Sequence, residues 1–148
     1  YPKRRGQTRV PELRDAGITI GFGSDCVMDP WYSLGKADML DVAFMGLHVG
    51  HMSSRADMRW CYEAVTANSA KLMGLEKYGL EVGNHAHFVI LQAKDTIEAI
   101  RLRANRLAVV RHGAIIAKTT PQITTINLPC RPSTVQSDTY APQSPSER

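Results

Sequence analysis

One acidic side chain stands where a parallel strand would deliver it to an active site. Residues 18–23 are apolar and partly β-branched, and they lead directly into Ser24 and Asp25. This pattern predicts that Ile18–Asp25 is a strand buried on both faces, as in a parallel α/β sheet. In β/α barrels, groups at the carboxyl ends of strands build the active site, and a carboxylate there can bind a divalent metal and take a proton from bound water. A helix-capping or loop-tying role for Asp25 is the alternative.

The elements that must position this strand can be read from the apolar spacing. Three- and four-residue steps between Leu34 and Leu47 predict a long helix that continues to about Val49. Shorter helices are expected at residues 8–16, 58–65, 67–73 and 95–102. A strand is expected at His87–Leu91, and two more, Leu107–Arg111 and Ala114–Lys118, should form a hairpin around His112-Gly113.

Composition excludes several function classes. The chain has 148 residues, 43% hydrophobic and 22% charged, with a formal charge of +4, which is typical of a soluble globular protein. Its basic clusters, such as Lys3-Arg4-Arg5, lack interleaved aromatic residues, so nucleic-acid binding is a remote alternative. No apolar run of about 18 residues is present, so we expect no membrane span.

The cysteines and the chain ends carry further expectations. Three widely spaced cysteines form no CxxC pair, which argues against a disulfide framework or thiolate zinc site and favours the cytoplasm. The start at Tyr1 is interpreted as a cut inside a larger protein. From Pro129 onward the chain is rich in Pro, Ser, Thr and Gln, and we expect a disordered tail.

Several stretches, in the same order along the chain, resemble stretches of a known family. They are Tyr1–Gly6, the DPWYxLG loop within Phe22–Gly35, Met45–Val49, Thr66–Ala70 and Phe88–Leu91. Over roughly residues 1–128, the sequence resembles the C-terminal part of bacterial cytosine deaminases of the amidohydrolase superfamily. The loop motif is specific to that branch, whereas the Thr66 helix motif occurs across the superfamily.

The resemblance implies an α/β fold, namely the last βα unit of a distorted (β/α)₈ barrel plus the C-terminal part of a small β-sandwich. The corresponding boundaries are 1–77 for the barrel part, 78–128 for the sandwich part and 129–148 for the tail. It also implies that Asp25 binds one divalent metal ion, iron or zinc, and shuttles the proton of the attacking hydroxide. Trp31 matches a tryptophan of the pocket wall, although packing between loop and barrel would explain it equally well.

Cys26 departs from the family pattern, which usually has a second aspartate beside the substrate ring. A thiol removes a charge and acceptor oxygens and leaves slightly more room. We therefore expect a shifted preference, toward a 5-substituted pyrimidine such as 5-methylcytosine, with isocytosine or another aminated azine equally open. Neutral drift at this position is the alternative, and a nucleophilic role is not expected.

The remaining candidates have structural interpretations. Asp29 should tie down its loop, and His48 and His51 should pack or face solvent. His85, His87 and His112 should be structural or exposed. The His85-Ala86-His87 spacing is interpreted as a chance match, because it precedes a sandwich strand. The family's HxH pair and glutamate proton donor are missing, and a PCxxC motif of the other zinc deaminases is absent as well.

The sequence thus predicts part of a cytosine-deaminase-like hydrolase that releases ammonia from a small pyrimidine-like substrate. The chain alone should be inactive, and the full-length protein should form a homo-oligomer. The alternative within the fold is an amidohydrolase that acts on a cyclic amide, an N-alkyl-amino-azine or isocytosine.

Overall fold

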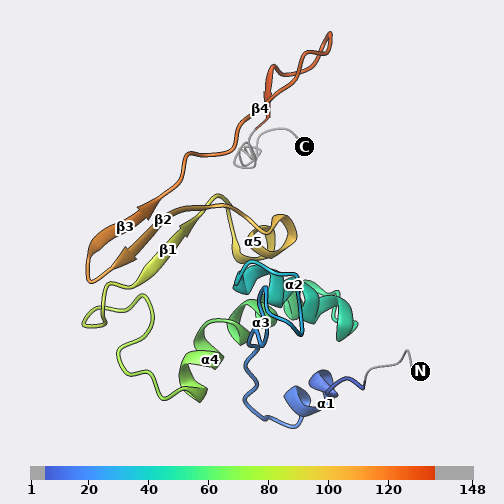
Figure 1. Ribbon diagram of the computed structural model, residues 1–148, viewed down its shortest axis with the longest axis vertical. Coiled ribbons are helices and arrows are strands. Elements are labelled where there is room, and N and C mark those ends of the chain that lie inside the picture. The colour runs from blue at the N-terminus through green and yellow to red at the C-terminus, as the bar shows by residue number, and fades with distance from the viewer. Residues whose placement is uncertain (1–5, 136–148) are drawn as a thin grey trace, which may run out of the picture.

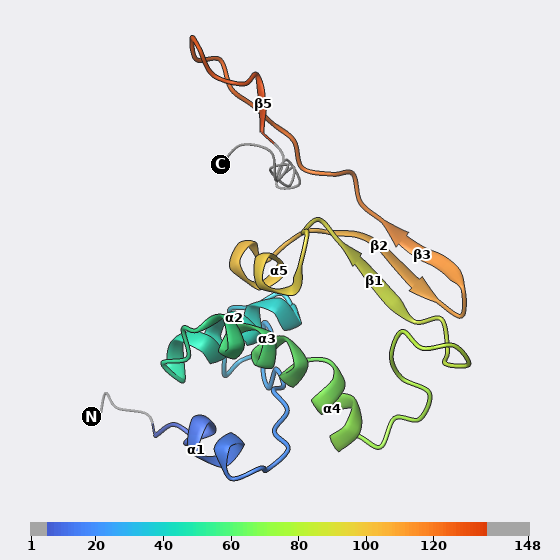
Figure 2. The same cartoon turned by 180° about the vertical axis from the view of Figure 1, so that it is seen from behind.

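The computed structural model describes residues 6–135 of the chain, and the Lys3-Arg4-Arg5 cluster lies outside them. Helices lie together on one side of the structure, a sheet lies beside them, and a thin hairpin projects beyond the sheet (Figure 1; Figure 2 shows the opposite side). In chain order, the elements are α1 (Val10–Asp15), α2 (Met39–Val49), α3 (Arg55–Ala64), α4 (Ala67–Leu72), β1 (Phe88–Leu91), α5 (Thr96–Leu102), β2 (Arg106–Arg111), β3 (Ala114–Lys118), β4 (Thr124–Thr125) and β5 (Thr134–Val135).

The core lies where α2, α3 and α5 meet. Ala43, Cys61 and Ile100, one from each helix, are almost completely buried. Small side chains at two of these positions let the helix backbones approach closely, which suits tight packing of short helices. This core fixes α2, the helix that forms one wall of the candidate site.

The starts of two helices differ from the sequence-based prediction. The helix expected from Leu34 begins at Met39, because Gly35 and Ala37 have left-handed φ values of 92° and 55° and Asp38 caps the first turn through Leu40 N. The helix expected at residues 58–65 begins at Arg55 instead, because Ser54 and Asp57 bond reciprocally in a capping box.

Thr8 and Thr66 are residue types that often cap helices, but neither caps the short helix that follows it. Thr8 does not cap α1, which begins at Val10 after Arg9 without a side-chain cap. Thr66 does precede α4, but its hydroxyl donates to the carbonyl oxygen of Tyr62 at 2.7 Å rather than capping that helix.

The predicted strand at Ile18–Asp25 is wrong for this structure. The segment is not a strand and is only half-buried, and Ile18 is 51% exposed. A parallel strand needs neighbours to satisfy its N–H and C=O groups, and no strand lies beside this segment among residues 6–135. It is held instead by α3 and α4, where Phe22 N donates to Ala64 O at 2.8 Å and Ser69 Oγ donates to Phe22 O at 3.3 Å.

Gly46 makes a testable contact between α2 and this segment. A Cβ added to Gly46 would lie 2.5 Å from the Phe22 ring, which also packs edge-on against Trp60. Alanine normally favours a helix over glycine by about 1 kcal/mol, but here we expect Gly46→Ala to lower the free energy of unfolding by about 1–3 kcal/mol through overpacking. Urea unfolding measures this change in the free energy of unfolding. Gly23→Ala is the control, because nothing lies within 4 Å of a Cβ there, and equal stability of the two variants would contradict the prediction.

The three-stranded sheet has the order β1-β2-β3, with both pairs antiparallel. The predicted hairpin is confirmed, since β2 and β3 are joined by His112 and Gly113, which both have positive φ. β1 also lies where it was expected, with Phe88 opposite Val110. The sheet has an exposed apolar surface. It is formed by side chains that are between 45% and 63% exposed, namely Val89, Ile90, Ile115 and Ile116.

The C-terminal region departs in part from the expected disorder. Thr124–Thr125 pairs with Thr134–Val135, so the chain is ordered beyond Pro129 as far as residue 135. The rest of the expected tail, 136–148, lies outside the described residues. In the described part of the chain, each helix is too short or too polar to cross a bilayer.

Candidate active site

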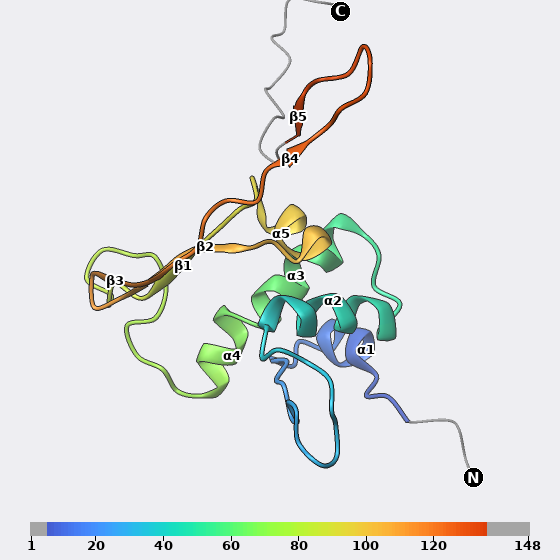
Figure 3. The same cartoon turned by 45° about the horizontal axis from the view of Figure 1, so that its top comes forward.

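The three predicted site residues line one cavity of about 580 Å³. Asp25 and Cys26 come from the end of the extended segment, Trp31 comes from the loop that follows, and Asp41 and Met45 come from α2. The loop between this segment and α2 projects away from the helices (Figure 3). The cavity therefore has one wall on a packed helix and the other on a loop.

Asp29 shapes the loop, as its sequence context predicted. Its Oδ1 accepts hydrogen bonds from the backbone N–H groups of Trp31 and Tyr32, both at 2.9 Å. Such a turn fixes the backbone beside Pro30. Asp29 thus holds the segment that carries Trp31.

The Cys26 thiol interacts with two carboxylates, those of Asp29 and Asp25. Hydrogen bonding to Asp29 raises the pKa of Cys26, and partial burial and the neighbouring Asp25 raise it further. The same hydrogen bond is the main cause that lowers the pKa of Asp29, and the bonds from Tyr32 N and Trp31 N add to it. Cys26 is therefore a neutral thiol at pH 7, which argues against a nucleophilic role because the thiolate is the reactive form.

Asp25 and Trp31 face solvent. Trp31 is 90% exposed, and Asp25 is also exposed. In the described chain the Trp31 indole is thus not buried between loop and core, and its large flat face is available at the rim of the cavity. The roles of Asp25, Cys26 and Trp31 remain predictions.

The cavity supplies only part of a metal centre. A carboxylate oxygen such as that of Asp25 is a suitable ligand for zinc, but a catalytic zinc ion takes three protein ligands. In residues 6–135 the side chains that could hold a metal as a group of three are His85, His87 and His112, and none of them lines this cavity. Asp25 therefore fits as one ligand of a metal whose other ligands are not in the cavity.

The other histidines take the places expected of structural residues. The His48 ring lies against Phe44, with centroids 4.3 Å apart, and its Nδ1 lies 2.8 Å from the Phe44 carbonyl oxygen. His51 is exposed just beyond the end of α2. His85, His87 and His112 are exposed as expected, but the sequence interpretation missed that they come together. The available signal was the predicted hairpin, whose turn carries His112.

Most of the chain matches one family model. Residues 1–119 match the model of the amidohydrolase family. The chain belongs to the amidohydrolase family. Its α/β architecture with an antiparallel sheet follows the fold of this family, which is metal-dependent.

Solved amidohydrolase structures resemble the chain closely. The 5-methylcytosine deaminase of Klebsiella pneumoniae liganded with phosphonocytosine is 42% identical, with a TM-score of 0.77, over 85% of this chain and 31% of that one. N-isopropylammelide isopropylaminohydrolase of Burkholderia multivorans is 33% identical, with a TM-score of 0.71, over 74% and 28%.

Two curated relatives are an amidohydrolase and a deaminase. N-isopropylammelide isopropyl amidohydrolase of Pseudomonas sp. strain ADP is 34% identical over 74% of this chain and 27% of the relative. Pterin deaminase of Rhizobium rhizogenes is 28% identical over 81% and 27%. The chain spans about a quarter to a third of the length of these amidohydrolases.

Proposed function

We propose that this chain is the C-terminal part of a metal-dependent hydrolase that removes the amino group of cytosine or 5-methylcytosine as ammonia. The observation that carries the proposal is the cavity in which Asp25, Cys26 and Trp31 meet. A flat heterocycle suits the exposed indole of Trp31, and the neutral thiol of Cys26 leaves room beside the ring. The 42% identity to a 5-methylcytosine deaminase supports this substrate class.

In this proposal the extended segment Ile18–Asp25 becomes the last strand of a (β/α)₈ barrel only when neighbouring strands from the rest of the full-length protein pair with it, and α2 is part of the helical layer of that barrel. The exposed apolar residues of β1 and β3 belong to a β-sandwich that other segments complete. Asp25 is one ligand of a zinc or iron ion and receives a proton during the reaction. The metal, when bound, supplies Lewis-acid activation of water.

Assays of ammonia release test this function. The full-length protein should act on cytosine and 5-methylcytosine, in preference to isocytosine, triazines and hydantoins. The 148-residue chain by itself should release none, because Asp25 is the cavity's only proposed metal ligand. Turnover by this chain alone, or an inactive full-length protein loaded with zinc or iron, would contradict the proposal.

A second candidate has specific support. An amidohydrolase that removes an N-alkyl-amino group from an azine is favoured by the 34% identity to N-isopropylammelide isopropyl amidohydrolase. Release of isopropylamine instead of ammonia in the same substrate panel would identify this activity.

Cys26 allows a prediction about substrate choice. In the full-length protein, Cys26→Asp should shift the ratio of kcat/KM values toward cytosine and away from 5-methylcytosine by about 10–200-fold, the range that one methyl group is worth in a fitted pocket. The reason is that a carboxylate is larger than the thiol and adds charge beside the ring. Cys130→Ser is the control, because Cys130 is exposed and does not line the cavity. An unchanged ratio in Cys26→Asp would place this residue away from the substrate.

A further inference from the structure

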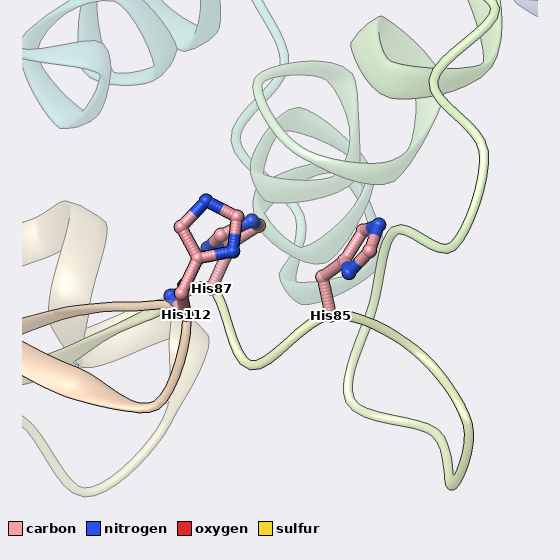
Figure 4. A group of neighbouring side chains, drawn as sticks. All are labelled: His85, His87 and His112. Carbon is pink, nitrogen blue, oxygen red and sulfur yellow. Dashed lines mark hydrogen bonds between the residues drawn. The ribbon is translucent and has the colours of Figure 1, made fainter.

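Three exposed histidines gather at one end of the three-stranded sheet. His85 and His87 lie on the segment that leads into β1, and His112 lies in the turn between β2 and β3 (Figure 4). One ligand atom from each lies within 4.8 Å of the others. The His87 and His112 ring centroids are 4.3 Å apart, and His85 lies 5.5 and 6.1 Å from them. Segments 25 residues apart thus bring three imidazoles together.

The backbone fixes this meeting. Because β1 and β2 are antiparallel with Phe88 opposite Val110, the residues before β1 lie beside the turn after β2. The peptide N–H of Gly113 donates to the carbonyl oxygen of Ala86 at 3.1 Å, and that of His112 donates to Nδ1 of His87 at 3.1 Å. The two segments are therefore tied to each other directly, independently of any ligand.

We propose that His85, His87 and His112 form a binding site for a borderline transition-metal ion such as Zn²⁺. Imidazole nitrogens suit zinc, nickel and copper, whereas calcium and magnesium prefer oxygen ligands. Three histidines with an open fourth position are a known zinc arrangement. The site is built from elements that do not line the Asp25 cavity.

The three imidazole rings must move slightly closer together to bind a metal ion. Zinc–nitrogen bonds of 2.0–2.1 Å in a tetrahedron place ligand nitrogens about 3.3–3.4 Å apart, so the rings must approach by about 1.5 Å at most. All three side chains are exposed and can rotate. Binding through His87 gives up the hydrogen bond from His112 N–H, whichever ring nitrogen coordinates, but water can satisfy this exposed N–H group.

The local charge favours the neutral rings that a metal requires. Partial desolvation lowers the pKa of His87, and the neighbouring His112, His85 and Arg111 lower it further. Metal ions bind the deprotonated imidazole. Arg111 also repels a cation, so affinity must come from the three nitrogens together.

The turn offers an unusually clean variant. His112 and Gly113 have φ values of 49° and 75°, the positive pair of a two-residue hairpin turn, for which Asn-Gly is strongly preferred. His112→Asn therefore keeps or strengthens the turn while it removes one imidazole. The chain contains five histidines, so His48→Asn/His51→Asn is a complementary double variant that retains only the proposed three.

Titration of the 148-residue chain with Zn²⁺ by calorimetry tests the site. We expect one saturable site. His112→Asn should lower its Zn²⁺ affinity by at least about 10–100-fold, which is the cost of losing a partner in the outer shell of a metal site. His48→Asn/His51→Asn should leave the affinity unchanged. Zn²⁺ should also shift the imidazole proton NMR signals of His85, His87 and His112 but not those of His48 and His51. Absence of saturable binding, or binding that His112→Asn leaves unchanged, would overturn the proposal.

Discussion

Replacing Asp25 with asparagine should lower ammonia release by the full-length protein by about 10²–10⁴-fold, the range for loss of a positioned acid–base group. The amide has the size and shape of the carboxylate but cannot take a proton and is a poorer metal ligand. Because Asp25 is exposed, the substitution should leave the fold intact. The loss should appear in kcat, since Trp31 and Cys26 still contact the substrate in our proposal.

The control for this prediction lies in the same cavity. Asp41→Asn also removes a negative charge from the cavity lining, but from α2 rather than from the end of the segment at residue 25. Its rate should stay within the same order of magnitude. Metal content, measured by mass spectrometry on both variants, separates lost metal from lost proton transfer. Full activity of Asp25→Asn would remove Asp25 from the mechanism, and equal losses in both variants would indicate a general charge effect.

The features that the sequence predicted best are those fixed by residues close together in the chain. The hairpin around His112-Gly113 is confirmed because its turn chemistry lies in two adjacent residues. Asp25, Cys26 and Trp31 share a cavity because they lie close together in the sequence. The role of Asp29 in its loop could be predicted because its hydrogen bonds are local, to the residues two and three places ahead.

The features that the sequence did not predict correctly depend on residues far away in the chain. A strand at residues 18–25 requires neighbouring strands, and none of the strands in residues 6–135 lies beside it, so the apolar pattern of this segment alone could not decide its conformation. The histidine cluster depends on the β1–β2 register, which sets which residues lie side by side. The predicted hairpin gave the pairing of β2 with β3 but not the register of β1 against β2, and the His85-Ala86-His87 spacing was interpreted in isolation.

One long-range contact that the sequence interpretation missed should have a large effect on stability. The Asp38 side chain is almost completely buried at the start of α2, where it accepts from Leu40 N at 2.9 Å and from both terminal nitrogens of Arg106 on β2. Burial by itself raises the pKa of Asp38, but the bonds from Arg106 and Leu40 outweigh it and hold that pKa below its usual value. The pair therefore joins the helices to the sheet.

Arg106→Met should lower the free energy of unfolding at pH 7 by about 2–4 kcal/mol. Loss of one partner from a buried pair costs about 3–5 kcal/mol, and we take less because the Arg106 side chain is 39% exposed and Lys36 Nζ remains 3.5 Å from Asp38 Oδ2. Arg9→Met is the matched control, since it breaks the exposed Arg9–Glu12 pair, and it should cost at most about 1 kcal/mol.

The pH dependence gives this prediction a second test. A carboxyl group whose pKa is lowered in the folded state stabilises the protein above its unfolded pKa of about 4, and this contribution is lost as the pH falls through the lower folded value. In urea unfolding, the difference between the unmodified chain and Arg106→Met should therefore shrink from pH 7 to pH 3. Adding Asp38→Asn to Arg106→Met should recover part of the loss, because asparagine still caps α2 and carries no charge to bury. Equal stabilities of Arg106→Met and Arg9→Met at pH 7 would show that the Asp38–Arg106 pair does not stabilise the fold.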